Sequence, residues 1–96
     1  MTSRQRGGED MANMKRPFFK MKDVQANEEL IVKENYGILC FEDFWLMNEG
    51  VDVLEVRINY SDEVLIIGID EVFKMQPNVY SCVVLNEGTV KYGGLY

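Results

Sequence analysis

The sequence predicts an all-β protein, a small antiparallel barrel or compact sandwich of five or six strands that allows one short helical turn near its N-terminus. Short apolar runs recur along the chain, and turn-forming residues separate them at intervals of about 8–12 residues. One run alternates between apolar and polar residues, which is typical of a half-buried strand. The chain has 96 residues, of which 47% are hydrophobic, enough for one core and one domain.

The N-terminal part divides into a tail and the beginning of the domain. Residues 1–14 are polar, contain two adjacent glycines and show no periodicity, so we predict a disordered tail. Residues 15–96 then form a single small β domain. Its first edge strand begins near Pro17, because proline cannot donate a ladder hydrogen bond and suits a strand start or an edge. The apolar residues of this strand are Phe18, Phe19 and Met21.

Two segments carry helical signals. Asp23 is a candidate N-cap, so residues 23–29 are predicted to form one or two helical turns. Residues 41–47 fit a helical turn as well as a strand, because periodicity cannot separate the two over so few residues.

The remaining elements are predicted to be strands. Residues 30–32 and 36–41 flank a tight turn at Glu34-Asn35. Residues 54–60 alternate between apolar and polar side chains, which makes this the clearest half-buried strand of the chain.

Two later runs, residues 64–69 and 79–85, are apolar on both faces and are expected to be central strands that are covered on both sides. Val90 and Tyr92 mark a last short strand, because they alternate with polar residues. A body of this size has little material to cover two such strands, so the pattern also predicts self-association, most simply as a homodimer.

One local pattern occurs twice, as Asn48-Glu49-Gly50 and as Asn86-Glu87-Gly88. Asn-x-Gly fits a three-residue hairpin loop in which the glycine adopts the left-handed conformation. We therefore predict two hairpins with the same turn chemistry rather than a duplicated binding loop.

The charges are divided unevenly along the chain. Residues 1–22 contain six basic and two acidic side chains, whereas residues 23–96 contain four basic and 14 acidic ones. A basic leader on an acidic body is typical of proteins with an interaction tail. The basic residues assigned to this tail are Arg4, Arg6, Lys15, Arg16, Lys20 and Lys22.

The residues needed for most catalysis are missing from the sequence. The chain has no histidine, which removes the commonest general base, and it has no phosphate-binding or nucleophile-elbow motif. Cys40 and Cys82 lie in apolar runs and are predicted to pack in the core as free thiols. The adjacent acidic pairs are interpreted as solvated charges. We therefore predict no enzyme activity, no catalytic residue, no metal site and no cofactor.

The cellular setting follows from the same composition. No apolar run approaches the roughly 18 residues of a membrane span, and no secretory signal follows the basic N-terminus. A cytoplasmic location is expected for a chain with two free thiols.

The leading functional hypothesis is a non-enzymatic protein–protein interaction module whose acidic body binds a partner with a basic surface. A specific version is a phage- or virus-type inhibitor that covers the basic groove of a nucleic-acid-binding protein. The alternative is a nucleic-acid-associated small β-barrel that uses its basic tail, although an acidic body disfavours phosphate binding. The residues predicted for an apolar interface are Trp45, Val79, Val83, Leu85 and Tyr92.

Overall fold

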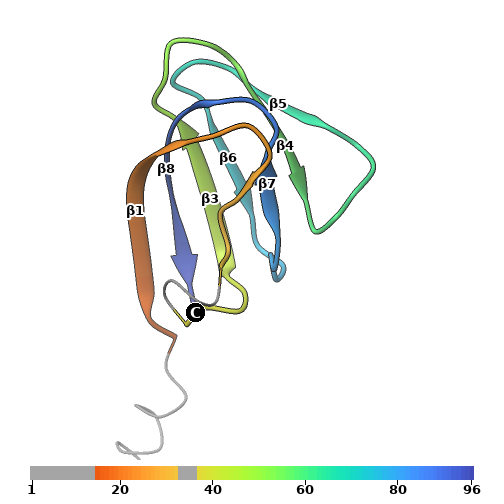
Figure 1. Ribbon diagram of the computed structural model, residues 1–96. Coiled ribbons are helices and arrows are strands. Elements are labelled where there is room, and N and C mark those ends of the chain that lie inside the picture. The colour runs from red at the N-terminus through yellow and green to blue at the C-terminus, as the bar shows by residue number, and fades with distance from the viewer. Residues whose placement is uncertain (1–14, 33–36) are drawn as a thin grey trace, which may run out of the picture.

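The computed structural model describes residues 15–32 and 37–96, which form a sandwich of two four-stranded antiparallel sheets (Figure 1). The first sheet contains, in spatial order, β1 (Pro17–Val24), β8 (Gly88–Leu95), β3 (Glu42–Asn48) and β6 (Val72–Met75). The second contains β2 (Glu28–Glu29), β7 (Cys82–Val84), β4 (Leu54–Ile58) and β5 (Leu65–Ile67). The predicted all-β class is confirmed as a sandwich with eight described strands rather than five or six.

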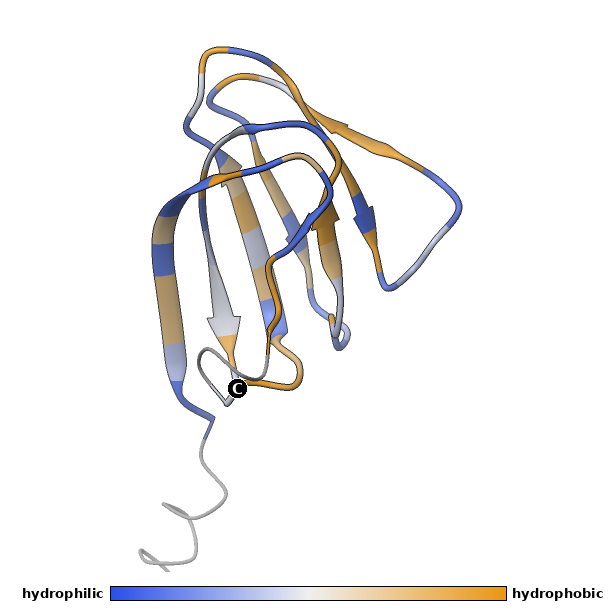
Figure 2. Ribbon diagram, in the orientation of Figure 1, coloured by the Kyte–Doolittle hydropathy of each residue, from blue (hydrophilic) through white to orange (hydrophobic). Residues whose placement is uncertain are grey.

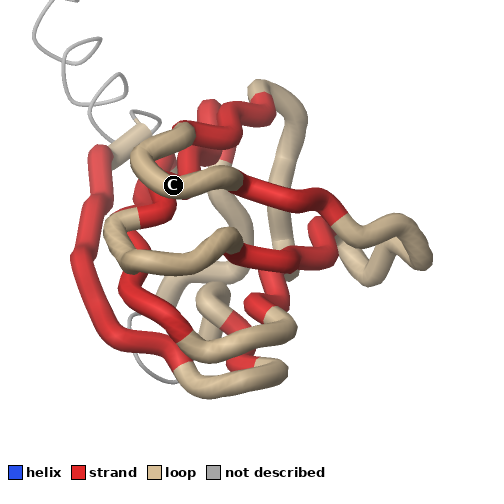
Figure 3. The backbone as a smooth tube through the Cα atoms, turned by 90° about the horizontal axis from the view of Figure 1, so that it is seen from above, coloured by secondary structure: helices blue, strands red, loops and turns tan. Residues whose placement is uncertain are grey.

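The chain changes sheet at most of its connections. Only β4 and β5 are both consecutive in sequence and paired in one sheet, while β1 to β4 and β5 to β8 alternate between the two sheets. The intervening loops therefore arch over the ends of the sandwich. Seen from above, the β4–β5 connection projects from one side of the two layers (Figure 3).

The core lies between the sheets and follows the strand alternation. On β4, Leu54, Val56 and Ile58 are buried whereas Glu55 and Arg57 are exposed, which confirms the period-2 prediction for this run. Apolar residues recur along the strands of both sheets (Figure 2). The largest fully buried side chains include Tyr92, Phe41, Phe44 and Leu46.

The predicted helical turns at residues 23–29 are wrong, and the described residues contain no helix. Strand β1 continues to Val24, and a turn with Asn27 at φ 63° leads directly into β2. The cause is tertiary pairing: Asp23 lies opposite Thr89 and accepts a hydrogen bond from its hydroxyl at 2.8 Å. A potential N-cap is thus used for a cross-strand bond instead.

The two strands predicted between residues 30 and 41 are also wrong where the structure describes them. Residues 30–32 and 37–40 form loops, although Leu30 is buried and its N–H donates to the carbonyl of Cys82 at 2.9 Å. Residue 36 and the turn predicted at Glu34-Asn35 lie outside the described residues. The open question at residues 41–47 is settled in favour of a strand, because Phe41 bridges Val79 and β3 follows at once.

The two runs that were expected to be central strands differ from each other. In residues 79–85 only Cys82–Val84 form a strand, and β7 does lie inside its sheet. In residues 64–69 only Leu65–Ile67 form a strand, and β5 is an edge strand on which Ile66 is 60% exposed. The prediction that this run is covered on both sides is therefore wrong for the isolated chain.

The two Asn-x-Gly segments are not hairpin loops. Each joins strands of different sheets, β3 to β4 and β7 to β8, and neither Gly50 nor Gly88 has a positive φ. Both asparagine side chains bond to the backbone of segments distant in sequence, although Asn48 also accepts a local hydrogen bond from the N–H of Gly50, and these distant bonds anchor the two connections.

Candidate protein-interaction surfaces

The residues predicted for an apolar interface do not form one surface. Val79 and Tyr92 are almost completely buried and belong to the core of the single chain. Val83 and Leu85 are partly buried at the second sheet. Trp45 is partly exposed and lies on the opposite side of the molecule, on the outside of the first sheet. Of these five side chains, a folded single chain therefore offers only Val83, Leu85 and Trp45 to a partner.

An apolar patch covers the outside of the first sheet around Trp45. The strand register places one row across Phe19, Gly93, Trp45 and Lys74, and a second row across Met21, Lys91, Met47 and Val72. Directly opposed residues share a face of the sheet, and Phe19 in the first row is 73% exposed. The name outer apolar face is used below for Phe19, Met21, Trp45, Met47 and Val72.

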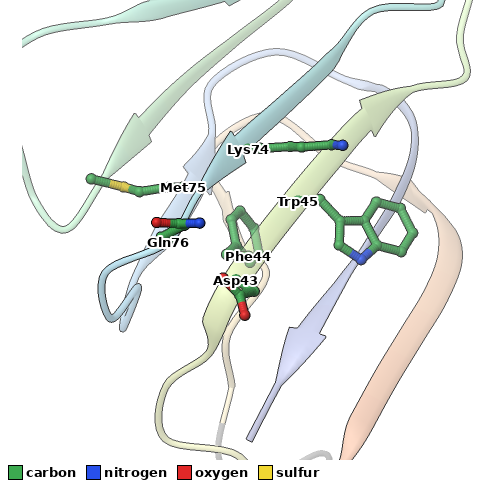
Figure 4. Close-up of a pocket in the computed structure, with 6 residues that line it drawn as sticks. All are labelled: Asp43, Phe44, Trp45, Lys74, Met75 and Gln76. Carbon is green, nitrogen blue, oxygen red and sulfur yellow. The ribbon is translucent and has the colours of Figure 1, made fainter.

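Gly93 separates the two aromatic residues of the first row. A Cβ atom at this position would lie 2.1 Å from the carbonyl oxygen of Phe18, which is far inside van der Waals contact. The missing side chain also leaves room beside Trp45, whose ring extends from β3 toward β8 (Figure 4). Only glycine therefore permits the close pairing of β1 and β8 beneath this face.

A hollow of about 340 Å³ lies at one end of β3 and β6 and is lined by Asp43, Phe44, Trp45, Lys74, Met75 and Gln76 (Figure 4). Asp43 has φ 50° and lies where the β3–β8 register shifts. The lining combines one carboxylate, one ammonium group and one amide with apolar surface, and it contains no nucleophile beside a base. This composition suits contact with another molecule better than group transfer.

The basic residues predicted as one tail fall into two groups. Arg4 and Arg6 lie outside the described residues, whereas Lys20 and Lys22 belong to β1. Lys15 forms an ion pair with Glu42 at 3.3 Å. Lys20 and Lys22 are thus part of the folded domain rather than of a tail.

Lys22 closes the sandwich between the two edge strands β1 and β2. Its ammonium group donates a hydrogen bond to the carboxylate of Glu28, which also accepts one from the N–H of Gln25 at 2.9 Å. Both bonds favour the ionised carboxylate, and together they hold the pKa of Glu28 below its ordinary value.

One end of the molecule is uniformly acidic. The β1–β2, β3–β4, β5–β6 and β7–β8 connections meet there, opposite the end from which β1 begins (Figure 1). These four loops contain no lysine or arginine, so no cation on them offsets their carboxylates. The name acidic end is used below for Glu49, Asp52, Asp70, Glu71 and Glu87.

A hollow of about 320 Å³ opens at this end between Asp23, Asp52 and Glu87. Val51, which also lines it, is 86% exposed. The acidic end thus offers a partner an exposed apolar contact together with carboxylates.

Asn48 and Asn86 hold the arches of the acidic end in place. The amide of Asn48 is buried, donates to the carbonyls of Asp52 at 2.8 Å and Ile67 at 3.1 Å, and accepts from the N–H of Gly50. The amide of Asn86 accepts from the N–H of Glu55 and donates to the carbonyl of Val53, each at 2.9 Å. These bonds fix the loop backbones, so the carboxylates stand on an ordered framework.

The two cysteines have different environments. Cys82 is fully buried, and burial, with a smaller contribution from the charge of Glu29, raises the pKa of its thiol. This confirms a packing role for Cys82, because a thiol that resists ionisation is a poor nucleophile. Cys40 is only partly buried and lies in a loop, so the prediction that it packs within a core strand is wrong.

Sequence reasoning missed a further feature, an apolar groove between the edge strands β5 and β6. Its lining includes Leu65, Phe73 and Met75, which are only partly buried. The apolar run of residues 64–69 was the available signal, but it was interpreted as a covered strand.

Comparison with known proteins adds no relative. No family model matches the chain, and neither the curated proteins nor the solved structures include a significant match. Within residues 15–32 and 37–96, no three histidine, cysteine or acidic side chains are grouped so that they could hold a metal ion. The same ranges contain no helix that is long and apolar enough to cross a membrane.

Proposed function

We propose that this chain is a non-enzymatic protein-binding module that uses its acidic end to recognise a partner with a basic surface. The observation that carries the proposal is the meeting of four loops that hold no cation, three of which together hold five carboxylates. Uniform charge on one surface accelerates the encounter with a complementary surface and disfavours partners of like charge.

The packing of the acidic end supports binding by a preformed surface. The side-chain bonds of Asn48 and Asn86 fix the β3–β4 and β7–β8 arches before any partner arrives. Less conformational entropy is then lost on association. The exposed Val51 side chain supplies an apolar contact within the charged surface.

The acidic end argues against the alternative of a nucleic-acid-binding domain, because it repels phosphate. Lys15 and Lys22 are also engaged with Glu42 and Glu28, which reduces the basic charge available for a nucleic acid. An inhibitor that covers the basic groove of a nucleic-acid-binding protein is a specific form of the proposal.

The homodimer and the cytoplasmic location are further parts of this proposal. A dimer would use the outer apolar face, because Val79 and Tyr92 are buried in each chain. A reducing compartment suits a protein in which Cys40 and Cys82 are free. Light scattering at micromolar concentration tests the dimer: an 11.1 kDa particle would contradict it.

Charge reversal at the acidic end tests the proposed function. The variant Glu49→Lys/Asp52→Lys/Glu87→Lys is compared with the charge-preserving variant Glu49→Asp/Asp52→Glu/Glu87→Asp in pull-downs at low and high salt. We expect the wild type and the charge-preserving variant to retain a basic protein at low salt, and the lysine variant to retain about tenfold less of it. Equal binding by both variants would contradict the proposal, and retention of oligonucleotides by the wild type would favour the alternative.

A further inference from the structure

The sandwich has an apolar groove along the side where β5 and β6 are edge strands. Two hollows of about 320 Å³ and 270 Å³ adjoin there and share Leu65 and Phe73 in their linings. Glu71 lines the first hollow and Glu63 the second, so a carboxylate stands toward each end. We call the two hollows together the edge groove, and its apolar lining consists of Ile58, Leu65, Ile66, Ile67, Val72, Phe73 and Met75.

The backbone of β5 is open toward this groove. The carbonyl of Glu55 in β4 accepts a hydrogen bond from the N–H of Leu85, and the N–H of Asn59, just after β4, donates one to the carbonyl of Ser81. Glu55 and Asn59 therefore direct their backbone groups toward the β7 side of β4. Along a strand, the backbone N–H and C=O groups of successive residues point to opposite sides. Leu54 and Val56 therefore direct their backbone groups toward β5, where their partners are Ile67 and Leu65. The intervening residue, Ile66, is left with its N–H and C=O on the open edge.

The residues of β5 do not include those that discourage the pairing of a further strand. Exposed edge strands are usually protected by charged residues, proline or bulges. Residues 64–67 contain none of these, and Ile66 is 60% exposed. An open backbone beside an apolar groove is the arrangement used to bind an added strand, whose alternate side chains enter the groove.

Charge decides between a second copy of this chain and a different partner. If β5 paired antiparallel with its own copy about Ile66, Asp62 of one chain would lie opposite Asp70 of the other, with Glu63 and Glu71 beside them. This repulsion would occur on both sides of the two-fold axis, and opposed like charges destabilise strand pairs. A strand with basic residues on either side of an apolar centre would instead meet carboxylates of opposite charge.

We propose that β5 is a β-augmentation site that binds an extended segment of another protein, with alternating apolar residues at its centre and lysine or arginine at its ends. The added strand pairs with the backbone of Ile66 and places its apolar side chains between Leu65 and Phe73. Its basic ends lie near Glu63 and Glu71. The proposal goes beyond the acidic end, because recognition here depends on backbone pairing and an apolar groove.

The test uses the synthetic peptide KKVTITVKK and its charge-reversed control EEVTITVEE, with binding to the full chain measured by fluorescence anisotropy. Ile66→Pro removes the donor on the open edge, whereas Ile66→Thr keeps it. We expect the basic peptide to bind the wild type and Ile66→Thr within about twofold of each other, and Ile66→Pro at least tenfold more weakly. We expect Glu63→Lys to weaken binding several-fold, while the matched control Glu42→Lys, at the beginning of β3 and outside both the edge groove and the acidic end, does not.

Chemical-shift mapping on the wild type provides an independent readout should Ile66→Pro fail to fold. We expect the amide of Ile66 and the side chains of Leu65, Phe73 and Met75 to respond to the peptide. Absence of binding, equal binding of the acidic peptide or unchanged binding by a folded Ile66→Pro variant would each overturn the proposal. Shifts confined to the acidic end would overturn it while favouring the proposed function. Concentration-dependent shifts at Ile66 without peptide would identify a second copy as the occupant and would also overturn it.

Discussion

Strands β1 and β5 both lie at the edge of a sheet, but only β1 carries the residues that discourage the pairing of a further strand. Pro17 begins β1, and Lys20 and Lys22 follow within the strand. Strand β5 has no charged residue and no proline, and an apolar groove runs beside it. The comparison shows that one sandwich can carry residues that discourage strand addition at one sheet edge and lack them at another.

Gly93→Ala tests the packing of the protected edge and should have the largest effect. The added Cβ would overlap the carbonyl oxygen of Phe18 across the β1–β8 ladder, so β1 must shift or detach. We expect a loss of about 3 kcal/mol in the free energy of unfolding, measured by urea denaturation. The control at the open edge, Ile66→Thr, should change it by about 0.5 kcal/mol or less, because this side chain is largely exposed. Equal losses would contradict the comparison.

Lys22→Met tests the ion pair that joins β1 to β2. The pKa of Glu28 is lowered in the folded chain, so the pair stabilises the folded state above the ordinary value of 4.5 and loses this contribution as the pH falls through the lowered pKa. Because both side chains are partly exposed, we expect a loss of about 0.5 kcal/mol at pH 7.

The wild type and Lys22→Met should differ in their free energy of unfolding at pH 7, and this difference should disappear in acid. Urea denaturation from pH 7 to pH 2 measures it. Lys74→Met is the control, because Lys74 forms no ion pair with a described residue. A difference that persisted at the lowest pH would assign the effect to packing instead.

Ile66→Lys tests the open edge and should have the smallest effect on stability. The side chain is 60% exposed, so we expect a change of about 0.5 kcal/mol or less in the free energy of unfolding. Lysine on an edge strand disfavours pairing, so light scattering during incubation at elevated temperature should show slower aggregation. Val51→Lys introduces the same charge outside a strand edge, and an equal benefit there would assign the effect to net charge alone.

The part of the fold that could be predicted from the sequence is the part set by local pattern. The alternation of Leu54, Val56 and Ile58 with charged residues correctly gave a half-buried strand, because a side chain's position along a strand fixes its face. Pro17 correctly marked the beginning of an edge strand for a similar reason, since its missing donor restricts where it can pair.

The failures concern which segments pair with each other. An apolar run such as residues 64–69 does not reveal whether its strand lies at the centre or at the edge, because that depends on segments distant in sequence. Asn48 and Asn86 carry good turn chemistry, yet their amides also bond to backbone groups that are distant in sequence. Asp23 could have capped a helix but bonds to Thr89.

The candidate sites divide in the same way. The acidic composition indicated the sign of the charge on the proposed binding surface. Of the residues predicted for an apolar interface, Trp45 keeps exposed area, whereas Val79 and Tyr92 are buried in the core. The gathering of five carboxylates at one end, and the groove beside Ile66, depend on topology. No local pattern could have predicted either one.

The backbone bonds between Arg16 and Tyr96 have a mechanical consequence. The N–H of Arg16 donates to the carbonyl of Tyr96 at 2.7 Å, and the N–H of Tyr96 donates to the carbonyl of Arg16 at 2.9 Å, so β1 begins beside the point where β8 ends. Force that pulls those two ends apart would act perpendicular to the strand axes of β1 and β8, along the hydrogen bonds that join them. The ladder would then unzip one pair after another instead of shearing as a unit, and the domain would yield to a weak pull despite its packed core.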